Sequence, residues 1–127
     1  MVKKKILIVD DEKDVLLMLE KRLSAEGYYV LTANNGRDAI NIAKSESPDL
    51  IILDVVMPGM EGDEVAEKLK EYPSTKKIPV IFLTAIIGKR ESRKKDHIIG
   101  GNFIFAKPFE SEELLDEVKT LVETAAV

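Results

Sequence analysis

Residues 50–54 read LIILD, an apolar run that stops at Asp54. Two other stretches have the same design, ILIVDD at residues 6–11 and FIFAKP at residues 103–108. Uninterrupted runs of aliphatic, β-branched and aromatic residues are typical of strands buried on both faces of a parallel sheet. In open α/β sheets the carboxyl ends of such strands line one crevice, where ligands bind. We therefore expect the charged residues that end these runs to meet at one edge of a sheet.

Strand-like and helix-like segments alternate along the chain. The strand-like segments fall near residues 5–10, 28–33, 50–54, 79–84 and 103–106, with helix-like stretches between them and at the end. This alternation indicates βα units around a parallel sheet, and right-handed crossovers leave few topologies. The prediction is a flavodoxin-like, doubly wound α/β fold with three α/β/α layers. It has five parallel strands in the order 2-1-3-4-5 and five helices.

Composition narrows the class of protein. The chain has 127 residues, 45% of them hydrophobic, which suffices for one domain of ordinary size with a core. It has no cysteine, and no apolar run approaches the roughly 18 residues of a membrane span, so we expect a cytoplasmic protein without membrane contact. The net charge of −4 argues against direct binding to nucleic acid. We expect a single domain over residues 1–127, with its core at about residues 4–122.

Three acids should meet where strands 1 and 3 lie side by side. Asp10 and Asp11 follow the first strand and Asp54 ends the third. Two carboxylates about 4 Å apart repel by roughly 4 kcal/mol at an effective dielectric of 20, so three will not sit together ionised unless a cation joins them or their pKa values rise. Oxygen ligands without neighbouring His or Cys favour Mg²⁺, with Mn²⁺ as an alternative. The alternative is that these residues are simply solvated charges at strand ends. That explanation suits a single aspartate better than all three together.

Four motifs stand in order at the predicted strand ends. They are DD at residues 10–11, Asp54 followed by MPGMEG at residues 57–62, LTA at residues 83–85 and KPF at residues 107–109. Together they resemble the receiver domain of two-component response regulators, over nearly the whole chain. Each motif alone is common, whereas the four in this order are specific.

The resemblance implies a phosphorylation switch and not an enzyme that turns over a separate substrate. Asp54 would be the nucleophile and phosphoacceptor. Its phosphoryl group would come from a sensor histidine kinase, a phosphotransfer protein or a small acyl phosphate. Asp10, Asp11, Asp54 and the backbone carbonyl of Val56 would hold the Mg²⁺ ion. The downstream target would be another protein, which the sequence does not identify.

The resemblance also implies which groups bind the phosphoryl oxygens. Lys107 would pair with them, and Thr84, followed by the small Ala85, would donate a hydrogen bond. Such a site works by positioning and charge neutralisation, as phosphoryl transfer favours. The family usually has an aromatic residue three positions before the lysine, and Ile104 stands there in this chain. The aromatic half of the family's usual conformational switch would then be missing. Thr84 could still move toward the phosphoryl group.

The first predicted helix offers a surface for a partner. At about 100° per residue, Leu16, Leu19 and Leu23 should share the core face. The opposite side of the helix, beside the acidic pair, would expose Val15, Met18 and Arg22. Together with Pro108 on the last loop, these residues could dock a pair of kinase helices. Scattered surface apolar residues are the alternative reading.

The predicted fourth helix includes the basic run KRESRKKD at residues 89–96. A solvated face, an acidic partner and self-association are all compatible with it. A monomer and a phosphorylation-dependent dimer therefore both stay open.

Two other functions are weaker fits to the motifs. The first is a binding module that keeps the fold without using phosphate, although the chain has every residue the chemistry needs. The second is a Mg²⁺-dependent phosphatase with an aspartyl nucleophile. Such enzymes usually have an Asp-x-Asp pattern on the first strand and a cap insertion. Asp10-Asp11-Glu12 has neither feature.

The residues beside the site predict slow loss of the phosphoryl group. Val56 and Ile86 stand two positions after Asp54 and Thr84, and neither side chain can orient an attacking water. We expect Val56→Asn to shorten the half-life of the phosphorylated protein, followed by intact mass at neutral pH. A half-life of seconds for the wild type would contradict this prediction.

Overall fold

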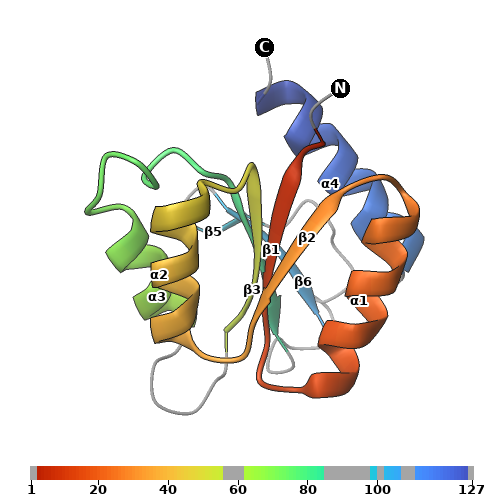
Figure 1. Cartoon of the computed structure of the whole chain (residues 1–127), viewed down its shortest axis with the longest axis horizontal. Coiled ribbons are helices and arrows are strands. Elements are labelled where there is room, and N and C mark those ends of the chain that lie inside the picture. The colour runs from red at the N-terminus through yellow and green to blue at the C-terminus, as the bar shows by residue number, and fades with distance from the viewer. Residues whose placement is uncertain (1–2, 56–61, 85–97, 100–101, 107–110, 126–127) are drawn as a thin grey trace.

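A computed structural model describes residues 3–55, 62–84, 98–99, 102–106 and 111–125. In this part of the chain one sheet has the strand order β2-β1-β3-β4-β6-β5. Helices cover both faces of the sheet, α1 and α4 on one side and α2 and α3 on the other (Figure 1). No helix among the described residues is long and apolar enough to cross a membrane.

The strands and helices have the following bounds. The strands are β1 (Lys5–Val9), β2 (Tyr29–Ala33), β3 (Leu50–Asp54), β4 (Val80–Thr84), β5 (Ile98–Ile99) and β6 (Asn102–Ala106). The helices are α1 (Lys13–Ala25), α2 (Gly36–Glu46), α3 (Gly62–Leu69) and α4 (Ser111–Ala125).

The topology confirms the flavodoxin-like prediction. β2, β1, β3, β4 and β6 are parallel neighbours in that order, which is the predicted order of the five strands. The sequence did not predict β5, a two-residue strand antiparallel to β6 at the edge of the sheet. Four of the five predicted helices are present, and the remaining one, at residues 89–97, lies outside the described residues.

Two apolar cores, one on each face of the sheet, hold the layers together. β3 is buried along its whole length, as its uninterrupted apolar sequence predicts for a central strand. Alternate residues point to opposite faces, so Ile52 packs with α1 and α4 while Leu53 packs with α2 and α3. The central strands are therefore fixed from above and below.

Helix α1 packs by a slightly different face from the one expected. Leu19 and Leu23 are buried, and Leu16 is partly buried, as predicted. The prediction of an exposed Val15 is wrong, because Val15 is partly buried against the same core. Residues 15, 19 and 23 are spaced by four, so they lie on one stripe of a helix. Met18 is 38% exposed, as expected for the outer side.

The end of α1 needs a glycine, as the sequence predicts. Gly27 has a φ of 98°, in the left-handed region that favours glycine. Its N–H donates to the carbonyl of Ser24 at 3.0 Å, and the N–H of Tyr28 donates to the carbonyl of Leu23 at 3.2 Å. This pair of bonds is the Schellman arrangement that ends a helix. α1 thus stops at the amino end of the sheet, where β2 begins.

Substitution of one buried and one exposed leucine of α1 tests which face of the helix packs against the core. Leu23 is fully buried and Leu17 is 55% exposed. We expect Leu23→Ala to lower the free energy of unfolding by about 3 kcal/mol, because it leaves a cavity. The matched Leu17→Ala should change it by less than about 0.5 kcal/mol. Urea denaturation measures both, and equal effects would contradict the assigned packing of α1.

Candidate functional site

The register of β1 and β3 brings two distant acids together. The strands pair in parallel from Ile6 with Leu50 to Val9 with Leu53. The next residues along the two strands are Asp10 and Asp54, so these lie side by side at the carboxyl end of the sheet. This end is the lower edge of the sheet in Figure 1.

Three carboxylates form a cluster at this edge. One side-chain oxygen each from Asp10, Asp11 and Asp54 lies within 4.8 Å of the other two. Asp10 is fully buried, Asp54 is 3% exposed and Asp11 is exposed. The expectation that these residues meet is confirmed. The cluster is open to solvent on the side of Asp11.

Backbone hydrogen bonds hold the cluster in place. The N–H of Asp10 donates to the carbonyl of Ala33 at 3.1 Å, which ties it to the end of β2. Oδ1 of Asp10 accepts the N–H of Glu12 at 2.9 Å, a local turn that leads into α1. The N–H of Val55, next to Asp54, donates to the carbonyl of Leu83 at 2.8 Å. Asp10 and Asp54 therefore stand on backbone that the sheet or a turn restrains.

The chemistry of the cluster fits a divalent cation. Two carboxylates at such a separation, taken as 4.8 Å, repel by about 3 kcal/mol at an effective dielectric of 20. Burial of Asp10 and Asp54 removes much of the water that would screen them. Hard oxygen ligands of this kind suit Mg²⁺ or Mn²⁺, and a magnesium ion uses few carboxylates and keeps free positions for water or phosphate oxygens.

The remaining predicted site residues are placed only in part. β4 lies beside β3, Leu83 pairs with Asp54, and the backbone of Thr84 pairs with that of Ala106. The ends of β4 and β6 thus reach the edge of the sheet where the acids lie, and Lys107 is next in sequence after β6. The other predicted residues lie outside the described part of the chain: Val56, Ala85, Lys107 and Pro108.

Gly62 belongs to the site, although the sequence placed it in a loop. It is the first residue of α3 and its N–H donates to the carbonyl of Val55 at 2.8 Å. The helix therefore begins directly beside the end of β3. In a single sequence, a glycine eight positions after an aspartate does not indicate that a helix begins beside that aspartate.

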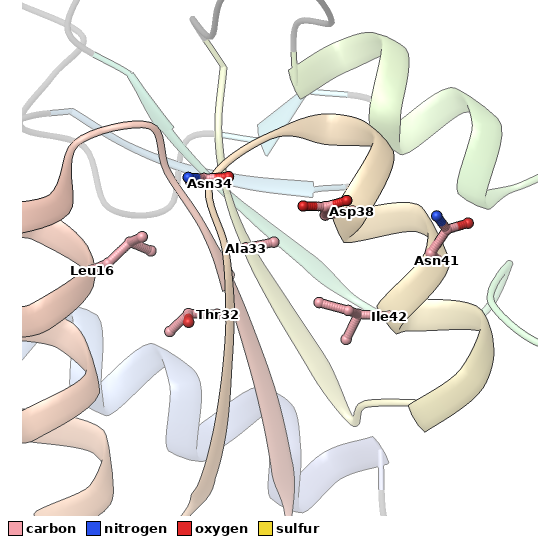
Figure 2. A pocket seen from close by; sticks show the side chains of 7 residues that line it. All are labelled: Leu16, Thr32, Ala33, Asn34, Asp38, Asn41 and Ile42. Atoms are coloured by element: carbon pink, nitrogen blue, oxygen red, sulfur yellow. The ribbon is translucent and has the colours of Figure 1, made fainter.

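A separate cavity of about 350 Å³ lies along the outer edge of β2 (Figure 2). Leu16 of α1 flanks the strand on one side, and Asp38, Asn41 and Ile42 of α2 flank it on the other. None of the three clustered carboxylates lines it. Asp38 is the titratable group in its lining, so the cavity lacks the convergent charges of the acidic cluster.

The expected docking surface on α1 is partly engaged within the molecule. Arg22 pairs with Glu112 of α4 at 3.2 Å, between two exposed side chains. Val15 is partly buried, whereas Leu17 and Met18 are exposed. A docking role for this side of α1 stays a prediction.

Comparisons with known proteins agree on one family. The family model described as the response regulator receiver domain matches residues 6–119. Response regulator PleD of Caulobacter vibrioides is 41% identical over 117 residues, covering 92% of this chain and 26% of that protein. Sporulation initiation phosphotransferase F of Bacillus subtilis is 38% identical over 119 residues and 94% of both chains.

A solved structure gives the same result. A putative response regulator from Chloroflexus aurantiacus matches with a TM-score of 0.83 and 34% identity, over 96% of this chain and 99% of that chain. Several of the curated relatives are longer: the chain spans about a quarter of PleD and about half of the probable transcriptional regulators ycf27.

Repulsion within the cluster predicts opposite effects of a substitution with and without metal. In metal-free buffer, Asp54→Asn should raise the free energy of unfolding by about 1 kcal/mol, because it removes one of the mutually repelling charges. Mg²⁺ at a hundred times its dissociation constant should stabilise the wild type by about 2.7 kcal/mol and the variant much less.

Chemical denaturation with and without Mg²⁺ measures both effects. Asp116→Asn removes an exposed carboxylate of α4 outside the cluster and is the matched control. Equal responses of Asp54→Asn and Asp116→Asn to Mg²⁺ would contradict a cation site at the cluster.

Proposed function

This chain belongs to the response regulator receiver domain family, and from that membership we propose that Asp54 accepts the phosphoryl group in a Mg²⁺-dependent reaction. The observation that carries the proposal is the acidic cluster. Asp54 is buried at the end of β3, and one of its carboxylate oxygens lies within 4.8 Å of a carboxylate oxygen of Asp10 and of Asp11. The whole of residues 1–127 is proposed to be one receiver domain, with its core at about residues 4–122.

Asp54 is suited to act as the nucleophile. One of its carboxylate oxygens would attack the phosphorus of the donor, the bond from phosphorus to the donor would break, and an aspartyl phosphate would form. A carboxylate is a weak nucleophile toward an anionic donor, so charge neutralisation decides the rate. Mg²⁺ held by the clustered carboxylates would supply that neutralisation.

Each neighbouring residue has a proposed role. Asp10 and Asp11 would hold the ion together with Asp54 and the carbonyl of Val56. Thr84 and Lys107 would bind phosphoryl oxygens, with the small Ala85 beside them. The support for Thr84 is that it follows the residue of β4 that pairs with Asp54. The support for Lys107 is that it follows β6, the strand next to β4.

Receiver domains of this family interact with sensor histidine kinases or phosphotransfer proteins. For this chain we propose that such a donor docks beside the acids on the outer side of α1, where Met18 is exposed. Arg22 and Pro108 complete the proposed surface, whereas Val15 packs toward the core and is not part of it. The resulting change in conformation would be read by another protein, with the chain acting as a monomer or as a phosphorylation-dependent dimer.

Intact mass after incubation with acetyl phosphate tests the proposal. With Mg²⁺ present, the wild type should gain the mass of one phosphoryl group, because the cation offsets repulsion between the acids and the donor. Asp54→Ala should gain none, and EDTA should abolish the gain in the wild type. Asp116→Asn is the control that should be modified like the wild type. Modification of Asp54→Ala to the same extent would overturn the assignment of Asp54.

A further inference from the structure

Gly62 approaches the backbone of Asp54, the candidate phosphoacceptor, more closely than a residue with a side chain could. A Cβ built on Gly62 would overlap the carbonyl oxygen of Asp54. It would also lie 2.8 Å from the Cα of Val55 and 3.0 Å from the carbonyl carbon of Asp54. Two carbon atoms pack at about 3.5 Å or more, so these contacts are too short. All three atoms belong to the backbone, so no change of rotamer could relieve the overlap.

Neither side of this contact can move away freely. Val55, which follows Asp54, is held by two hydrogen bonds of 2.8 Å: its N–H donates to the carbonyl of Leu83, and its carbonyl accepts the N–H of Gly62. α3 is held by Val65, Ala66 and Leu69, which are buried in the core on its side of the sheet. A methyl group at residue 62 would therefore displace either the start of α3 or the backbone that carries the Asp54 side chain.

We infer that Gly62 is a positioning residue: its lack of a side chain lets α3 begin against the backbone of Asp54 and so fixes the carboxylate within the acidic cluster. This inference rests on the proposed function of Asp54. Gly62 does not touch the reacting atoms itself. It acts through the backbone of Asp54, and a catalytic geometry displaced by about 1 Å can lose up to a hundredfold in rate.

Gly27 provides a matched control elsewhere in the same fold. It lies after α1, at the amino end of the sheet and so at the opposite end from the acids. Nothing lies within 4 Å of a Cβ built on Gly27, but its φ of 98° strains any other residue. Gly27→Ala and Gly62→Ala are thus the same chemical change. Both lower stability, one by strain far from the site and one by overlap at the site.

The test is a Mg²⁺ titration of the wild type and both variants, followed by backbone amide chemical shifts. It is run at a temperature where each protein is folded. We expect the Mg²⁺ affinity of Gly62→Ala to fall by about tenfold or more, and that of Gly27→Ala to stay within about twofold of the wild type. A purely structural role would lower the melting temperature of both variants and leave both affinities unchanged. That result would overturn the inference.

Three further outcomes are decisive. If Gly62→Ala is unfolded, all three proteins are titrated in trimethylamine N-oxide, which favours the folded state. If it stays unfolded there while Gly27→Ala folds, the glycine is structural and the inference is wrong. A wild type that binds Mg²⁺ but takes no phosphoryl group from acetyl phosphate would refute the proposed function and leave this comparison valid. A wild type that binds no Mg²⁺ would refute both.

Discussion

Repulsion among three carboxylates at the carboxyl end of β1 and β3 is the constraint on which the rest of the structure depends. The parallel register forces Asp10 and Asp54 to be neighbours, and both are buried. A sheet gains nothing in stability from such an arrangement, since each ionised group repels the next. In the proposed function the arrangement has a use, because a divalent cation and a phosphoryl group would share the site. Relief of the repulsion would then add to the affinity for the cation.

The surrounding fold restrains the positions of the acids. β3 is packed between two apolar cores, so Asp54 stands on a strand that cannot slide. Asp10 is tied to β2 through the carbonyl of Ala33. On the remaining side, α3 starts against the backbone of Asp54 because residue 62 has no side chain. Positioning of this kind is what phosphoryl transfer requires from a protein.

Much of this could be predicted from the sequence, and the exceptions have physical reasons. Long apolar runs such as residues 50–54 predict buried parallel strands, and the strand order followed from the alternation of strands and helices and the handedness rule. β5 was missed because two residues are too few to show a pattern. Val15 was misplaced because the core face of α1 is wider than the predicted stripe and includes both Val15 and Leu16. The role of Gly62 depends on a close approach between backbones, which no side-chain pattern reveals.

Anomalous scattering from crystals grown with Mn²⁺ tests the central claim most directly. Mn²⁺ prefers the same oxygen ligands as Mg²⁺ and is visible by its anomalous signal. A single strong peak should lie between the carboxylates of Asp10, Asp11 and Asp54, and it should be absent from crystals of Asp54→Ala. A peak elsewhere in the molecule, with these three carboxylates splayed apart, would contradict the account.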